Sequence, residues 1–133
     1  MGRGRALSPG ERARLVPSLR AHPAARVFLA WSGARAVGVA VCFLAFSTFR
    51  ARPVLNVHDL AVAAAWRGRG IGRALLEHVR VEAERSGCCR LTLEVREDNV
   101  RARRLYARLG FAQAEGAPGV AMQRWQRELA VGD

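Results

Sequence analysis

Residues 54–76 read VLNVHDLAVAAAWRGRGIGRALL, and this stretch decides the fold of the chain. Its first part is apolar and rich in β-branched residues, which predicts a buried strand. A glycine-dense turn follows at 67–72, and good helix formers begin directly after it. The first N–H groups of a helix have no partner within the helix, and its dipole is positive there, so this unit predicts an anion-binding site. Gly68, Gly70 and Gly72 leave the backbone open to a phosphate.

Two common phosphate-binding motifs do not fit this turn. A Walker loop ends in Lys-Ser or Lys-Thr, and the chain contains no lysine. A dinucleotide fingerprint needs G-x-G-x-x-G, whereas this turn runs G-x-G-x-G. The spacing that remains is Arg67-x-x-Gly70-x-Gly72, with HDLAV before it and ALL after it. With these flanks the stretch resembles motif A of the GCN5-related N-acetyltransferase (GNAT) superfamily, in which the turn holds the pyrophosphate of acetyl-CoA.

A second motif follows at the expected distance. Residues 99–111, NVRARRLYARLGF, keep the pattern N-x-x-A-x-x-L-Y-x-x-x-G-F. This pattern resembles motif B of the same superfamily. Together with the strands around them, the two motifs cover roughly residues 26–128.

The remaining elements follow from hydrophobic periodicity and turn residues. Before the glycine turn, the predicted elements are a short helix capped by Ser8 and disturbed at Pro17, followed by an antiparallel meander of strands at 26–31, 36–46 and 54–62. After it, they are a helix from the glycine turn to Arg85, a strand at 89–96 and a helix capped by Asp98 or Asn99. The chain then continues with a strand from Phe111, a turn at 116–119 and a last strand near 120–128. The strand at 36–46 is apolar at almost every position, so we expect it to be covered on both faces. Gly38 within it indicates a bulge or a close packing contact.

The resemblance implies a GNAT fold, in the α+β (α/β) class, as a single domain over residues 1–133. Its central sheet is mixed and mostly antiparallel, with about six strands flanked by about three or four helices. The sheet splays between the strands at 54–62 and 89–96, and the thioester lies in that gap. Family members usually begin with a strand before the first helix. Here we expect that strand to be missing, reduced to a remnant at 3–7, or lost to a misplaced start codon. A bare sheet edge would then remain, and a second copy of the chain could cover it as a homodimer.

Composition excludes several classes of protein. No apolar run approaches the ~20 residues that span a bilayer, and the N-terminus lacks the apolar region of a signal peptide. Cys42, Cys88 and Cys89 have no metal-ligand spacing, so we expect reduced thiols, no metal and a cytoplasmic protein. The net charge is +11 and all 22 basic residues are arginine, which is typical of a GC-rich, bacterial-like genome. Because the arginines are scattered without interleaved aromatic residues, we expect a solvated basic surface that attracts an anionic cofactor rather than nucleic acid.

The resemblance also assigns residues to acetyl-CoA. It implies that backbone groups of the strand end pair with the pantetheine arm, at Leu60, Ala61 and Val62. It implies that the turn and the first helical residues hold the pyrophosphate, at Arg67, Gly68, Arg69, Gly70, Ile71, Gly72 and Arg73. Asn99 is expected to reach the pantetheine or phosphate region, and Tyr106 to lie close to the sulfur.

The chemistry of acyl transfer explains the catalytic candidates. An amine attacks the thioester carbonyl and a thiolate leaves, so the reaction needs a base, an acid and a donor for the developing oxyanion. The resemblance implies that a backbone N–H near Val62 is that donor. It also implies that Tyr106 is the acid, and this role is favoured over the alternative that Tyr106 is a core aromatic residue on its helix.

The base is left open among several groups. His58 lies four residues before Val62, where serotonin acetyltransferases carry a histidine, and imidazole titrates nearest to neutrality. Glu94 lies twelve residues before Tyr106, as does a glutamate of ribosomal-protein alanine acetyltransferases, which share the LEVR stretch. Asp59 and a water molecule are further candidates. Because neighbouring strand residues point to opposite faces, His58 and Asp59 can both face the cleft only if a bulge intervenes.

The sequence therefore predicts an acetyl-CoA-dependent N-acetyltransferase that acts on a primary amine by direct attack. A small-molecule acceptor is narrowly preferred over a protein or peptide N-terminus. The main alternative is a non-catalytic module that binds acyl-CoA or a protein partner. A basic nucleic-acid-binding domain is the third reading.

Overall fold

The structure is a computed structural model that describes residues 7–114 and 122–131. Its elements, in chain order, are α1 (Pro9–Ala21), β1 (Ala25–Ser32), β2 (Arg35–Ser47), β3 (Arg52–Val62), the 3₁₀-helix η1 (Ala64–Trp66), α2 (Ile71–Arg85), β4 (Arg90–Arg96), α3 (Val100–Arg108), β5 (Ala112–Gln113) and β6 (Met122–Glu128). The predicted strands and the two helices of the motifs are confirmed within two residues at each end. The turn expected at 116–119 lies outside the described residues. Among those described, no helix is long and apolar enough to cross a bilayer.

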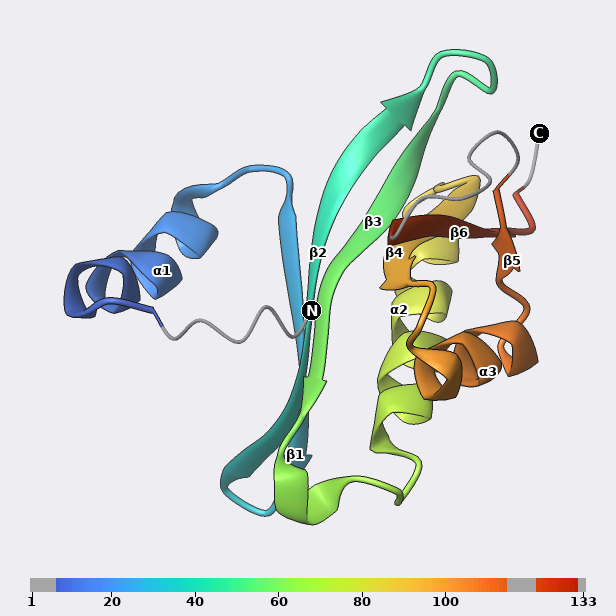
Figure 1. Cartoon of the computed structure of the whole chain (residues 1–133). Helices are drawn as coiled ribbons and strands as arrows, with labels where there is room; N and C mark the ends of the chain where they lie inside the picture. The colour runs from blue at the N-terminus through green and yellow to red at the C-terminus, as the bar shows by residue number, and fades with distance from the viewer. Residues whose placement is uncertain (1–6, 115–121, 132–133) are drawn as a thin grey trace.

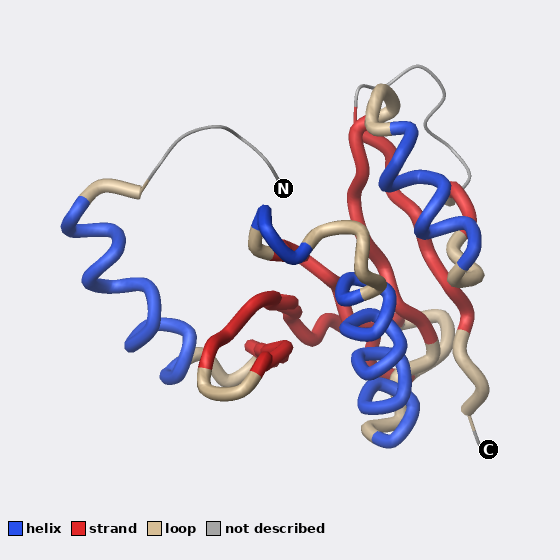
Figure 2. Tube along the Cα trace, turned by 90° about the horizontal axis from the view of Figure 1, so that it is seen from below, coloured by secondary structure: helices blue, strands red, loops and turns tan. Residues whose placement is uncertain are grey.

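The described strands form one sheet in the order β1-β2-β3-β4-β6-β5. Every neighbouring pair is antiparallel except β3 and β4, which are joined by the crossover helix α2 and run parallel. Figure 1 shows α2 and α3 on one side of the sheet and α1 on the other, and Figure 2 shows the same division from below. The expected mixed, mostly antiparallel sheet flanked by helices is thereby confirmed.

The core lies between α2 and the sheet. The apolar stripe of α2 is buried at i, i+1, i+4 and i+8, through Leu75, Leu76, Val79 and Ala83. Leu76, Val79 and Ala83 share one cluster with alternate residues of β3 and β4, namely Leu55, Val57, Leu91 and Leu93. Residues of α3 and the segment after it complete the cluster, through Tyr106, Leu109 and Phe111.

Gly38 lets α2 approach β2 closely. A Cβ atom at this position would lie 3.0 Å from Cδ1 of Leu75 and 3.1 Å from Cγ2 of Ile71, closer than packed carbon atoms normally come. The β1–β2 register also shifts beside it, between the pairs Ala30–Gly38 and Trp31–Ala36. Both consequences expected of this glycine, a bulge and a close contact, are therefore present.

The opposite face of the sheet is largely open in the described part of the chain. The expectation that β2 is covered on both faces is wrong, because Val39 and Val41 are only half-buried there. The β1 side chains that share this face are more exposed still, with Val27 at 46%, Leu29 at 48% and Trp31 at 59%. A continuous apolar run indicates a strand, but it does not show that a helix packs on each face.

The helix α1 lies on this open side without packing on it. None of its residues is buried, and Figures 1 and 2 show it standing away from the sheet. Its predicted capping box is present: the Glu11 N–H donates to Ser8 Oγ at 3.1 Å, and the Ser8 N–H donates to Glu11 Oε1 at 2.9 Å. Helical geometry continues through Pro17 to Ala21 instead of being disturbed; Ala13, whose carbonyl loses its partner to Pro17, is an exposed residue.

Candidate active site

β3 and β4 separate half-way along β3. Their parallel ladder begins at Val54–Arg90 and ends at Val57–Leu93. Beyond that pair β3 continues over 58–62 and β4 over 94–96, with no further pairing between these two segments among the described residues. This separation is the predicted splay of the sheet. The two strands are paired over 54–57 and 90–93 and diverge beyond these residues.

A cavity of about 160 Å³ lies at the splay. Its walls come from the diverging ends of β3 and β4, from the start of α3 and from β6, through Leu60, Glu94, Val95, Arg96, Asn99, Ala102, Tyr106 and Met122. Four of the residues singled out in the sequence therefore meet here: Leu60, Glu94, Asn99 and Tyr106. Ala102 belongs to the motif-B pattern, whereas Val95, Arg96 and Met122 carry no chemical signature in the sequence, so only the fold could bring these three to the site.

The glycine turn has the geometry of an open anion cradle. Gly68 and Gly70 have φ values of +77° and +82°, in the left-handed region that favours glycine, and Gly70 is the N-cap of α2. A Cβ atom built on either residue would meet no atom within 4 Å. The space above this backbone is therefore free, and the unpaired N–H groups of the α2 N-terminus lie beside it. These features fit a pyrophosphate.

Two arginine side chains brace the turn, which the sequence did not indicate. Arg67 donates from Nε to the backbone oxygen of Val62 at 3.1 Å, so it ties the glycine turn back to the end of β3. The guanidinium carbon of Arg69 lies 4.7 Å from the ring centroid of Trp66, a cation–π contact within the same turn. Gly72 faces inward, with Val62 Cγ2 and Leu105 Cδ2 each 3.9 Å from where its Cβ would stand. The first turn of α2 thus packs against the ends of both β3 and α3.

Tyr106 is a buried residue that also lines the cavity. Its side chain is 4% exposed and its ring centroid lies 5.9 Å from that of Phe111. Burial raises the pKa of the Tyr106 hydroxyl above its ordinary value, because the charged phenolate is poorly solvated there. The hydroxyl therefore keeps its proton at neutral pH. Both expected roles, core aromatic and neutral proton donor, are compatible with this position.

Asn99 caps α3 and lines the cavity at the same time. Its Oδ1 accepts a hydrogen bond from the Ala102 N–H at 3.1 Å. Asp98, the other predicted cap, instead accepts two hydrogen bonds from Arg96, each at 3.0 Å. The motif-B asparagine thus fixes the start of the helix that carries Tyr106.

A β-bulge in β3 lies at His58. On the neighbouring strand Val41 pairs with Asp59 and Cys42 pairs with Val57, so His58 is an extra residue in the ladder. The His58 ring is exposed and meets the ring of Phe43 edge-on, with centroids 5.6 Å apart. Because of the bulge, His58 and Asp59 both lie on the face of the sheet opposite α2.

Glu94 lies on that same face of the sheet. Its neighbours Leu93 and Val95 are buried in the core, so alternation directs Glu94 away from α2. The side chain is exposed and reaches the cavity at the splay. In the parallel register, Glu94 and His58 each follow the last pair of the ladder. All three candidate bases therefore lie on one face, at the point where the strands part.

The cysteines are structural residues. Cys42, Cys88 and Cys89 are free and buried, and burial raises the pKa of the Cys42 thiol to about 12. Among the described residues, no group of three or more His, Cys, Asp or Glu side chains could hold a metal ion.

Comparison with known proteins connects this geometry to a family. The model of the acetyltransferase (GNAT) family matches residues 5–111, which include both motifs and the splayed strands. This chain belongs to the GNAT family. The two sequence motifs and the splayed sheet are therefore both features of this family membership.

Individual relatives of the GNAT family match shorter segments. N-alpha-acetyltransferase 40 of Saccharomyces cerevisiae is 43% identical over 76 residues, which cover 52% of this chain and 27% of the relative. The [Ribosomal protein bS18]-alanine N-acetyltransferase of Escherichia coli is 46% identical over 59 residues, which cover 44% of this chain and 40% of the relative. The matches thus span less than half the length of these curated relatives.

A solved structure extends the similarity over the whole fold. The crystal structure of the ribosomal-protein-S18-alanine N-acetyltransferase from Escherichia coli superimposes with a TM-score of 0.77. The match covers 98% of this chain and 83% of that chain at 22% sequence identity. At this identity the similarity supports the fold alone.

Proposed function

We propose that this protein is an N-acetyltransferase that transfers the acetyl group of acetyl-CoA to a primary amine by direct attack. The observation that carries the proposal is the cavity at the splay, whose lining includes both Tyr106 and one of the candidate bases, Glu94. Family membership supports the donor and the reaction. A cytoplasmic location is part of the proposal, since the three cysteines are unpaired thiols.

The donor side of the site lies with α2 and α3. Acetyl-CoA supplies an activated acyl group as a thioester. The N–H groups around Gly68 and Gly70 would bind its pyrophosphate, and β3 beyond Val57 would lie along its pantetheine arm. Arg67 donates a hydrogen bond to the Val62 carbonyl, which links the phosphate-binding turn to the strand end that would hold the acyl group.

The proposed acid and the candidate bases lie on opposite faces of the sheet. Tyr106 remains protonated at neutral pH because it is buried, so it can donate a proton to the leaving thiolate. Glu94 and His58 lie on the opposite face, where an acceptor amine could enter without crossing the donor site. Either group, Asp59 or a water held by them would remove the proton from the amine. A backbone N–H near Val62 would stabilise the oxyanion.

The relatives shift the preferred acceptor. The sequence narrowly favoured a small molecule, but of the two curated relatives described above one is named an N-alpha-acetyltransferase and the other is named for an alanine of ribosomal protein bS18. The open face of the sheet beside Glu94 also offers room for an extended peptide. We therefore place the α-amino group of a protein or peptide first and a small-molecule amine second. A non-catalytic CoA-binding module stays as the alternative to both.

The test is a thiol-release assay with acetyl-CoA and a panel of peptides that differ at the first residue, with polyamines and aminoglycosides alongside. Release of CoA with an N-terminal peptide would support the proposal, and mass spectrometry would locate the added acetyl group. Tyr106→Phe should abolish most of the turnover while CoA binding by calorimetry stays unchanged. CoA binding without turnover on any amine would instead favour the non-catalytic module.

A further inference from the structure

An arginine lies directly across the sheet from Glu94. β6 runs antiparallel to β4, and Arg124 of β6 pairs with Glu94. Residues that face each other across an antiparallel pair point to the same side of the sheet, so the Arg124 side chain lies on the face that carries the candidate bases. The sequence did not indicate this residue, because only the register of β6 against β4 brings it to the site.

The backbone hydrogen bonds show that Glu94 and Arg124 approach closely. The Leu129 N–H donates to the Cys89 oxygen at 2.9 Å, and hydrogen-bonded and non-hydrogen-bonded pairs alternate from there along the β4–β6 ladder. The Arg124 oxygen accepts instead from the Ala114 N–H at 2.8 Å, on the β5 side of β6. Glu94 and Arg124 are therefore a non-hydrogen-bonded pair, the kind whose Cα atoms lie only about 4.5 Å apart.

These two opposite charges nevertheless do not bind each other. Two places along the same ladder, the pair Arg90–Glu128 forms an ion pair across the same face, with Nε and Oε1 2.9 Å apart. Within the part of the chain that the structure describes, Glu94 and Arg124 form no such ion pair, and no other carboxylate binds Arg124. The Glu94 side chain turns into the cavity at the splay instead. Both charges are thus available to a ligand on this face.

We propose that Arg124 binds a carboxylate of the acceptor, so that the preferred acceptor carries a carboxylate close to the amine that is acetylated. This inference rests on the proposed function, in which Glu94 lies next to that amine. An ammonium group beside Glu94 and a carboxylate beside Arg124 would each meet an opposite charge at the spacing of one cross-strand pair. The planar guanidinium suits this role, because it can bind both oxygens of a carboxylate. An acidic residue near the start of a peptide would supply the carboxylate, and so would a free amino acid.

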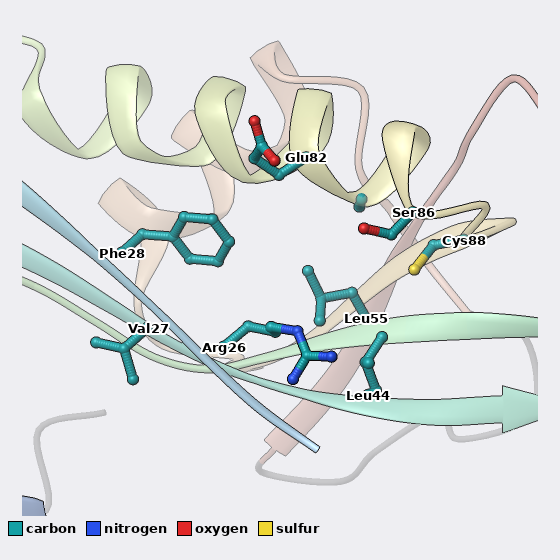
Figure 3. A pocket seen from close by; sticks show the side chains of 9 residues that line it. Arg26, Val27, Phe28, Leu44, Leu55, Glu82, Ser86 and Cys88 are labelled. Carbon is teal, nitrogen blue, oxygen red and sulfur yellow. The ribbon is translucent and has the colours of Figure 1, made fainter. Parts of the chain in front are cut away.

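Arg26 also lies beside a cavity, but on the other face of the sheet. It pairs with the fully buried Cys42, so its side chain is directed to the α2 side. The cavity there has a volume of about 200 Å³, with Arg26 and Phe28 on the β1 side and Glu82 and Ser86 on the α2 side (Figure 3). Because it faces away from the candidate bases, Arg26 provides a matched control for substitutions of Arg124.

Paired acceptors that differ in one charge test the inference. Peptides that begin Ala-Asp and Ala-Asn form one pair, and alanine and alaninamide form the other. Calorimetry in the presence of CoA measures acceptor binding without turnover, and the thiol-release assay gives kcat/KM for the same four acceptors. In at least one pair, the member with the carboxylate should bind about tenfold more tightly, the effect of one charge-assisted hydrogen bond. The pair that shows this difference identifies the source of the carboxylate.

The variants assign the preference to one side chain. Arg124→Gln should remove the difference within the pair, whereas Arg26→Gln should keep it. Arg124 is an exposed residue, so its substitution leaves the core intact, and circular dichroism checks the fold of each variant. The charge reversal Arg124→Glu should make a peptide that begins Ala-Lys bind more tightly than one that begins Ala-Asp.

The binding readout separates this inference from the proposed function. Equal affinity within both pairs, or no binding of any of the four acceptors, would overturn the inference, and so would a carboxylate preference that survives Arg124→Gln. A carboxylate preference in binding that depends on Arg124, without acetylation of any acceptor, would support the charge recognition and contradict the proposed function alone.

Discussion

Replacing Gly38 by alanine puts a methyl group where α2 leaves no room for it. The new Cβ would stand 3.0 Å from Leu75 Cδ1 and 3.1 Å from Ile71 Cγ2, well inside normal carbon contact. Overpacking of this kind costs about 1–3 kcal/mol. The alanine also restricts the unfolded chain, which returns about 0.4–1 kcal/mol. We expect a net loss of about 1–2 kcal/mol in the free energy of unfolding.

Gly72→Ala is the matched control, because it makes the same chemical change within α2. Its Cβ would lie 3.9 Å from the nearest side chains, an ordinary contact, and alanine gains up to about 1 kcal/mol over glycine inside a helix. Urea titrations followed by circular dichroism should therefore move the two midpoints in opposite directions. With a slope of about 2 kcal/mol/M, the variants should differ by about 1 M. Equal stability of Gly38→Ala and the unmodified protein would refute the packing argument.

Four further outcomes follow from the site and the core. Tyr106→Phe should lower kcat by about 100-fold or more with CoA affinity unchanged, since a general acid contributes that much; equal losses in both would point to a structural role. Gly70→Ala should weaken CoA binding in calorimetry, because φ is +82° there and a side chain at this φ costs about 1–2 kcal/mol. Cys42 should resist thiol reagents in the folded protein, given its pKa of about 12, and react only after denaturation. Burial alone would raise the pKa of Glu77, but hydrogen bonds from Arg127 and Arg80 leave this pKa lowered. The Glu77 carboxylate therefore stabilises the fold above the ordinary glutamate pKa, and this stabilisation is lost as pH falls through the lowered pKa of the folded state. Glu77→Gln should thus reduce the free energy of unfolding at pH 7, and the difference from the unmodified protein should disappear in acid.

The parts of this protein that the sequence predicted depend on local rules. The strand–glycine–helix unit follows from β-branched residues, from glycines at 68 and 70 and from helix formers after them. The α3 helix follows from an asparagine cap and an apolar stripe that ends at Gly110. Each of these signals acts within a few residues, so no knowledge of the rest of the fold is needed to use it.

The parts that the sequence did not predict depend on contacts between distant segments. The bulge at His58 exists because Cys42 pairs with Val57 and Val41 with Asp59, and that register cannot be read from either strand alone. The Arg67 contact with Val62 depends on the course of the backbone through η1. The uncovered face of β2 was missed because apolar composition shows what a strand could bury, whereas burial depends on which helix reaches it.

The short ladder between β3 and β4 has a mechanical consequence. Four residue pairs join these strands, whereas ten join β2 to β3 and seven join β4 to β6. The sheet thus has two extensively paired parts, β1–β3 and β4–β6, joined by a short parallel ladder. A hydrogen bond from Asn56 Nδ2 to Thr92 Oγ1 at 2.9 Å lies across that ladder. The two sides of the cleft are therefore joined within the sheet by four residue pairs, and beneath it by the core that α2 shares with β3 and β4.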